Sequence, residues 1–71
     1  MPAPLETTRV DVASSTVTYI GKAAIGSSEA DPVWKIQKMI SDVNGGLSIL
    51  HVDGQSKSNS TWNDRTLYAY A

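Results

Sequence analysis

The stretch VWKIQKMISDVNGGLSILHV, residues 33–52, decides which fold this chain can form. It contains two apolar runs that are separated by Asn44 and Gly45, a pair that is a strong short-range signal for a β-hairpin turn. The second run alternates between apolar and polar positions, as a half-buried strand does. The stretch therefore predicts a hairpin of two antiparallel strands.

The first half of this stretch also admits a helix, over residues 33–43. Asp31 would cap that helix, Pro32 would take its first position, and Gly45 would end it. Its apolar stripe would consist of Ile36, Met39, Ile40 and Val43. We favour the hairpin, because it explains the apolar runs on both sides of the Asn-Gly pair and the helix explains only one.

As a strand, the segment before the turn has two distinct faces. One face consists of Trp34, Ile36 and Ile40, and the opposite face of Lys35, Gln37 and Met39. Lys38 does not fit this pattern, because it falls on the apolar face. After the turn, Leu47, Ile49 and His51 lie opposite Ser48, Leu50 and Val52.

Upstream, residues 16–24 read TVTYIGKAA and predict another strand, since they are rich in β-branched and aromatic side chains. One face would carry Val17, Tyr19 and Gly21, and the other Thr16, Thr18 and Ile20. A glycine inside a strand, here Gly21, indicates a bulge or a close approach of the backbone. Residues 10–12, VDV, predict a short edge strand, and residues 26–32, GSSEADP, predict a loop.

The rest of the chain completes an all-β domain. Residues 53–60 predict a polar loop, Asn63 and Asp64 a turn, and residues 66–70 a closing strand with Tyr68 and Tyr70 on one face. We expect one domain over residues 10–71, a sandwich or barrel of about five antiparallel strands. Residues 1–9, which are polar and contain two prolines, predict an extended N-terminal arm.

Composition limits the chemistry that is open to the chain. It has 71 residues, six basic against seven acidic side chains, no cysteine, and one histidine, His51. Disulfides and thiolate metal sites are therefore excluded, and one imidazole is too few for a histidine metal cluster. A chain this short rarely nets more than about 3–5 kcal/mol from its own core. Association with other chains is then the remaining source of stability.

The sequence contains no complete catalytic motif. Gly21 and Gly26 have P-loop spacing, but Ser27 follows the second glycine where a P-loop requires lysine. The chain has no nucleophile-elbow sequence that would supply a serine for His51 to activate, so His51 is better interpreted as a strand residue. Asp42 and the acids of the predicted loops, Glu29, Asp31, Asp53 and Asp64, are typical caps and turn formers. We therefore expect no enzymatic activity, no cofactor and no metal.

Aromatic side chains offer an alternative function. Tyr19, Trp34, Trp62 and Tyr68 could stack on single-stranded nucleic acid, with Lys35, Lys38 and Arg65 nearby. The formal net charge of −1 argues against nucleic acid as the partner, since such binders carry a basic surface. A small free-standing module for single-stranded nucleic acid or a host protein remains the alternative. No apolar run reaches the length of a membrane span, so we expect no membrane contact.

Several short motifs occur in an unusual order. They are Tyr19-Ile20-Gly21-Lys22-Ala23, the small-residue loop 26–30, Trp34-Lys35-Ile36, Trp62-Asn63-Asp64-Arg65, and the strand 67–70. In this order the chain resembles short virion-associated structural proteins of tailed bacteriophages. The resemblance covers the chain from about Val10 onwards and implies a β-rich building block without catalytic residues.

The resemblance also implies partners and a location. It predicts a capsid decoration protein or a part of the tail, neck or fibre, bound to other virion proteins in many copies or as a homo-oligomer. The chain would be made in the cytoplasm of the bacterial host, and its arm could add a strand to a neighbour's sheet. Trp34 and Tyr19 would build the core, and Arg65 would pair with an acid. The interface or structural candidates are Tyr19, Gly21, Trp34, Ile36, Trp62, Arg65, Tyr68 and Tyr70.

Overall fold

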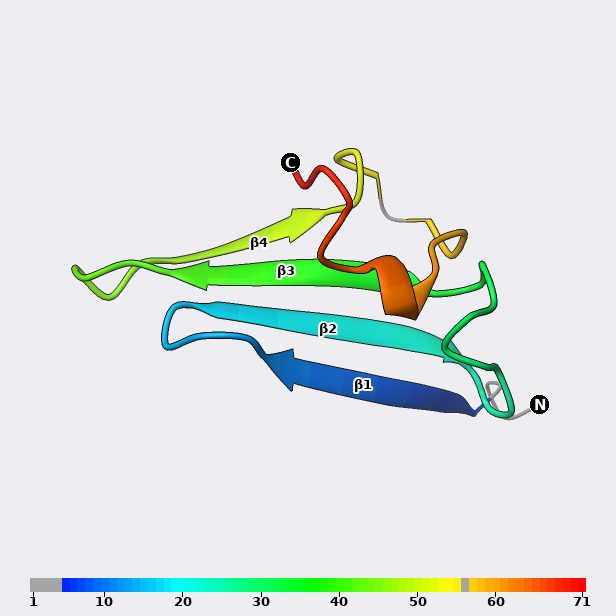
Figure 1. The fold of residues 1–71 in the computed structure, drawn as a ribbon. Coiled ribbons are helices and arrows are strands. Elements are labelled where there is room, and N and C mark those ends of the chain that lie inside the picture. Colours follow the sequence, from blue (N-terminus) through cyan, green and yellow to red (C-terminus); the bar gives the residue numbers. More distant parts are fainter. Residues whose placement is uncertain (1–4, 56) are drawn as a thin grey trace.

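A computed structural model describes residues 5–55 and 57–71 and shows one antiparallel sheet (Figure 1). Its four strands follow one another in chain order: β1 (Glu6–Val12), β2 (Val17–Ala24), β3 (Lys35–Ser41) and β4 (Leu47–His51). A single 3₁₀ turn, η1 (Trp62–Asp64), follows within the C-terminal segment, residues 60–71. Figure 1 shows this segment lying across one face of the sheet. The all-β prediction is confirmed.

The hairpin is confirmed, and residues 33–43 do not form the alternative helix. Its turn spans residues 42–46, where the Asp42 amide donates to the Gly46 carbonyl oxygen at 3.0 Å. The Asp42 carboxylate accepts hydrogen bonds from the amides of Asn44, at 2.8 Å, and Gly46, at 2.9 Å. Gly45 has a φ of +81°, which glycine adopts without steric cost. Asp42 therefore is a turn former, as the sequence indicates.

The edge strand is longer than the sequence indicates. Residues 10–12 are its second half, because β1 begins at Glu6 and pairs with β2 from Glu6 opposite Ala24 onwards. Residues 6–9 of the expected arm therefore belong to the sheet. Arg9 holds this part of the strand in place through an ion pair with Glu29, whose Oε2 lies 3.0 Å from Nε. Residues 1–4 of the expected arm lie outside the described residues.

The expectation of about five strands in a sandwich or barrel is wrong. The described residues form one open sheet of four strands, with β1 and β4 at its edges. Residues 66–70 do not form a fifth strand, because their tyrosines bond to the backbone of their own segment. The Tyr68 hydroxyl accepts from the Thr61 amide at 2.8 Å, and the Tyr70 hydroxyl donates to the Arg65 carbonyl oxygen at 2.6 Å. The segment folds on itself and meets the sheet through two isolated bridges, from Ser60 to Trp34 at its start and from Tyr70 to Val52 at its end.

The core lies between the sheet and the C-terminal segment. Its buried members are Tyr19, Ala23, Trp34, Ile36 and Trp62. The rings of Trp34 and Trp62 pack with centroids 5.9 Å apart, and they supply the bulk of a core that has no phenylalanine. Trp34 is fully buried, and its indole N–H donates to the Ser28 carbonyl oxygen at 2.9 Å. Burial of the ring therefore leaves no polar atom unpaired.

At Gly21 the Trp62 ring of the segment lies directly against the backbone of β2. A β-carbon at this position would lie 2.5 Å from Cε3 of Trp62 and 3.1 Å from Cε3 of Trp34. Real β-carbons do not come so close to a ring. Of the two explanations for a glycine inside this strand, the close approach is confirmed.

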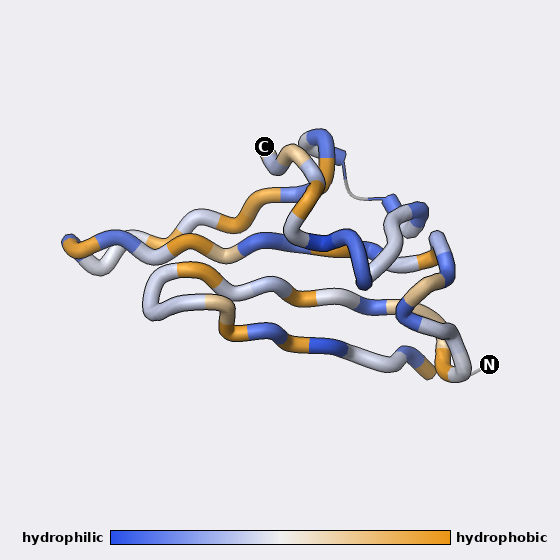
Figure 2. The backbone as a smooth tube through the Cα atoms, in the orientation of Figure 1, coloured by the Kyte–Doolittle hydropathy of each residue, from blue (hydrophilic) through white to orange (hydrophobic). Residues whose placement is uncertain are grey.

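Apolar and polar residues alternate along the strands, as the tube in Figure 2 shows. The faces assigned from the sequence are confirmed by the register, in which Tyr19 pairs with Lys38 and Gly21 with Ile36.

The part of the chain that the structure describes has no helix with the length and hydropathy needed to cross a membrane.

Candidate interaction surface

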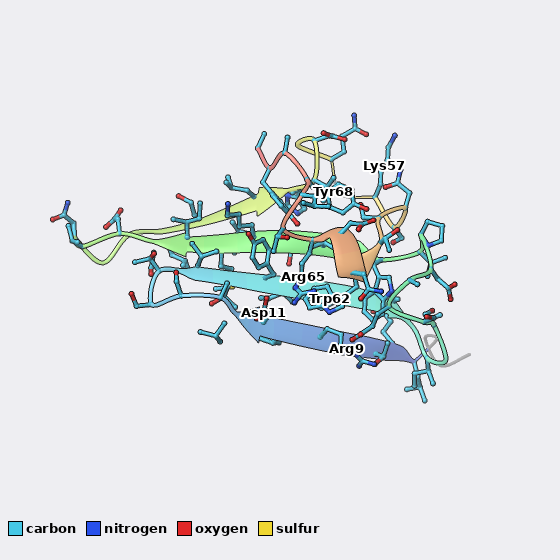
Figure 3. The ribbon with its side chains drawn as sticks, in the orientation of Figure 1. Arg9, Asp11, Lys57, Trp62, Arg65 and Tyr68 are labelled. Carbon is cyan, nitrogen blue, oxygen red and sulfur yellow. The ribbon has the colours of Figure 1, made fainter. Side chains whose placement is uncertain are left out.

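Arg65 fastens the C-terminal segment to the edge of the sheet. Its Nε lies 3.0 Å from Oδ2 of Asp11 in β1, and its Nη1 donates to the Trp62 carbonyl oxygen at 3.2 Å. The guanidinium also lies 4.6 Å from the centroid of the Trp62 ring, within cation–π distance. Figure 3 shows these side chains together above β1 and β2. The expectation that Arg65 pairs with an acid is confirmed.

Removing the contacts of Arg65 should lower the stability of the fold. We expect Arg65→Ala to lower the free energy of unfolding by about 1–2 kcal/mol, because it deletes a charge-assisted bond and leaves Asp11 without its partner. The Arg9–Glu29 pair has the same 3.0 Å separation but more exposed side chains, so Glu29→Gln should cost less than Asp11→Asn. Urea denaturation followed by tryptophan fluorescence measures all three. Equal losses for the two acid variants would contradict this order.

Lys38, which does not fit the apolar pattern of β3, has a place between two tyrosine rings. Its Nζ lies 5.8 Å from the ring centroid of Tyr19 and 5.6 Å from that of Tyr70. The two rings themselves pack with centroids 5.8 Å apart. An ammonium above aromatic faces is attracted to both, so the charge is accommodated on the covered face.

Tyr70 makes the stability of the fold sensitive to pH in the alkaline range. Burial is the main reason that its pKa rises from 10.0 to about 12. Charges on Tyr19 and Tyr68 also raise this pKa, whereas the guanidinium of Arg65 lowers it. The neutral hydroxyl is therefore favoured in the folded chain more than in the unfolded chain.

The sign of the pH dependence follows from that difference. Below pH 10 the Tyr70 hydroxyl is neutral in both states and its full contribution to stability is present. Between pH 10 and about 12 the unfolded state loses the proton first, so the free energy of unfolding should fall as pH rises. Urea midpoints measured from pH 8 to pH 12 test this, and Tyr70→Phe should flatten the fall. An equally steep fall in the phenylalanine variant would contradict the assignment to Tyr70.

The structure brings all the candidate residues of the sequence together, but at the core. Tyr19, Gly21, Trp34 and Ile36 come from the sheet, and Trp62, Arg65, Tyr68 and Tyr70 from the segment that covers it. Trp34 is 0% exposed and Trp62 is 4% exposed, so neither offers a surface to a partner. Their position gives these residues a structural role in holding the C-terminal segment on the sheet.

The opposite face of the sheet carries an apolar surface that sequence reasoning missed. The register aligns residues from all four strands in rows across this face. One row consists of Val12, Thr18, Met39 and Ile49, and the next of Val10, Ile20, Gln37 and His51. We call the apolar side chains of these rows, with Leu47, the open-face patch: Val10, Val12, Ile20, Met39, Leu47 and Ile49.

The open-face patch is exposed to solvent. Val12 is 70% exposed, Val10 62%, Leu47 57% and Ile49 52%. Single exposed apolar residues are common on protein surfaces, but a contiguous group of them marks an interaction site. Each of these residues is unremarkable in the sequence, and only the strand register, which joins four separate segments, shows that they are neighbours.

The charges of this face lie at one end, outside the patch. Lys22 is paired with Lys35 in the register, and Glu6 lies one row further along β1. The centre of the face contains polar but uncharged contacts, including a 3.1 Å hydrogen bond between Nε2 of Gln37 and Nε2 of His51. The surface thus has an apolar half and a mainly basic end.

Within residues 5–55 and 57–71, no three side chains of histidine, cysteine, aspartate or glutamate gather as metal ligands would. The main feature of this surface is the contiguous, exposed apolar area of the open-face patch. Comparisons with protein-family models, with curated proteins and with solved structures found no match for this chain.

Proposed function

We propose that this protein is a structural component of a tailed-phage virion that acts through protein–protein contacts. It would decorate the capsid or form part of the tail, neck or fibre, after synthesis in the cytoplasm of the bacterial host. The observation that carries the proposal is the open-face patch. An exposed apolar group in cross-strand register is expected to be covered by another protein when the chain is at work.

Three properties of the chain support this role. The motif order from Tyr19 to Tyr70 resembles that of short virion-associated proteins. The core is small and is closed on only one side of the sheet, so an assembly would add stability that one copy lacks. Repetition in a particle also multiplies weak contacts, because each bound copy holds its neighbours close to their own sites.

The alternative of a module for single-stranded nucleic acid has less support. Base stacking needs exposed rings, but Trp34 and Trp62 are buried, and Tyr19 is only 7% exposed. The exposed end of the open face holds two lysines, Lys22 and Lys35, together with Glu6. This is a small basic surface on a chain with a formal charge of −1.

Quantitative mass spectrometry of purified particles tests the proposed function. The particles should be those of the phage whose genome encodes the chain, separated from free protein on a density gradient. We expect the chain to band with the particles at a fixed ratio to the major capsid protein. A ratio near one per capsid subunit would indicate capsid decoration, and a much smaller fixed ratio would indicate neck, tail or fibre. Absence from washed particles would contradict the proposal.

A further inference from the structure

We infer that the open-face patch packs against the same patch of a second copy of this chain, so that two open sheets form one β-sandwich. This inference deepens the proposed function by naming the partner of that surface.

The geometry of the sheet already matches one half of a sandwich. In a sandwich, two sheets pack face to face about 10 Å apart, and apolar side chains from both inner faces fill the space. Here the C-terminal segment covers one face of the sheet, and the other face carries the open-face patch. The principal extents are 42 × 27 × 20 Å, so the face is long enough for a second sheet to pack against its apolar half. A second copy supplies a sheet of the same size and twist.

The area of the face sets the expected strength of the contact. Four strands about 4.8 Å apart and about seven residues long cover roughly 450 Å² in projection. Full overlap of two such faces would remove at most on the order of 1,000 Å² of accessible surface from water, the lower limit for a specific interface, and the overlap of the apolar halves alone removes less. We therefore expect a dimer with a dissociation constant in the micromolar range or weaker.

The charges favour one arrangement of the two copies. A two-fold axis parallel to the strands would place Lys22 and Lys35 of one copy opposite the same lysines of the other, which is repulsive. An axis perpendicular to the strands, through the row of Met39, runs the two sheets antiparallel. Each lysine end then lies beyond the patch, toward the hairpin turn of the other copy. The open-face residues next to that turn, Ser41 and Leu47, are uncharged, so the two lysine ends are kept apart.

In this arrangement the apolar rows of one copy pack against the same rows of the second copy. No charged residue lies in the rows of Val12 and Val10, so two copies can meet there without burying an unpaired charge. Val43, which is 98% exposed at the tip of the hairpin, would lie near Lys35 of the second copy. The β3–β4 turn extends beyond the β1–β2 turn in Figure 1 and is free to make that contact.

Sedimentation velocity of the purified chain over a range of concentrations tests the inference. The wild-type chain should change from monomer to dimer as its concentration rises through the micromolar range and above. Ile49→Lys and Val12→Lys should each weaken dimerisation at least tenfold, because every substitution occurs twice in a symmetric interface and buries a charge each time. Both sites are more than half exposed, so circular dichroism should show that the monomers still fold.

Leu67→Lys provides the matched control. Leu67 is an apolar side chain with 79% exposure, but it belongs to the C-terminal segment on the other face. This variant should dimerise as the wild type does. A wild-type chain that stays monomeric at millimolar concentration would overturn the inference, as would open-face variants that dimerise normally. A monomeric chain that is still found in particles would overturn the dimer while leaving the proposed function standing.

The arrangement of the copies has its own test, which the absence of cysteine makes simple. A mixture of Lys35→Cys and Val43→Cys chains, treated with a short bismaleimide, should yield mainly the mixed cross-linked dimer. Cross-linking mainly between two Lys35→Cys chains would overturn the antiparallel arrangement.

Discussion

Replacing Gly21 by alanine is expected to lower the free energy of unfolding by about 2–4 kcal/mol, since overpacking in a dense core forces its neighbours to move. The new methyl group would lie 2.5 Å from Cε3 and 2.7 Å from Cζ3 of Trp62. Trp62 cannot retreat freely, because the ion pair between Arg65 and Asp11 holds the segment at 3.0 Å. The loss approaches the whole stability of about 3–5 kcal/mol that a chain of this size can have.

Thermal and urea unfolding, followed by circular dichroism, measure this effect. Ala24→Val adds more atoms to the same strand but at an exposed position, so it should change stability little. In a Trp62→Leu background the Gly21→Ala substitution should cost less, because the smaller side chain leaves room for the methyl group. Equal costs in the two backgrounds would show that the close approach to Trp62 is not the cause.

Trp34→Ala is expected to have the largest effect of any single substitution. The side chain is 0% exposed, and deletion of a buried tryptophan typically costs about 3–5 kcal/mol through lost burial and the cavity that remains. The change also removes the donor that bonds to the Ser28 carbonyl oxygen. We expect a chain that is largely unfolded at 25 °C, with flattened amide dispersion in a ¹⁵N correlation spectrum.

Two controls separate the causes of this loss. Trp34→Phe keeps an aromatic ring but removes the indole N–H, so it should lose less stability than alanine does. Val43→Ala removes an apolar side chain that is 98% exposed and should leave the unfolding midpoint unchanged. A Trp34→Ala chain that remained fully folded would contradict the core assigned here.

The hairpin of residues 33–52 was predictable because its signals are local. Asn44 and Gly45 determine a turn, and alternation determines which side chains share a face. Even the misfit of Lys38 was visible in the sequence. Its explanation was not visible, because the rings of Tyr19 and Tyr70 come from distant parts of the chain.

The prediction of a closing strand over residues 66–70 was wrong because tertiary contacts override the local pattern. Its alternating tyrosines are typical of a strand, but the hydroxyl of Tyr70 bonds to the Arg65 carbonyl oxygen and that of Tyr68 accepts from Thr61. These bonds fold the segment over the core. Without a fifth strand the sheet stays open, and no periodicity in the sequence distinguishes the two outcomes.

The candidate site was also only partly predictable from the sequence. The aromatic residues attract attention in the sequence, and they are the core. The open-face patch is composed of ordinary aliphatic residues, such as Val12, Met39 and Ile49, that become neighbours only through the register of four strands. Sequence reasoning therefore identified the residues of the core and missed the exposed apolar surface on the other face of the sheet.

We propose that the covered face of the sheet stabilises the fold and that the open face binds other proteins within a particle. Competition between variants for incorporation into particles tests this division of roles. Wild-type chain and Ile49→Lys are produced together in infected cells, and mass spectrometry compares their ratio in the lysate with that in purified particles. Leu67→Lys is run in parallel against wild type. We expect Ile49→Lys to be depleted from particles at least severalfold and Leu67→Lys to be incorporated in proportion. Equal incorporation of Ile49→Lys and wild type would contradict the claim.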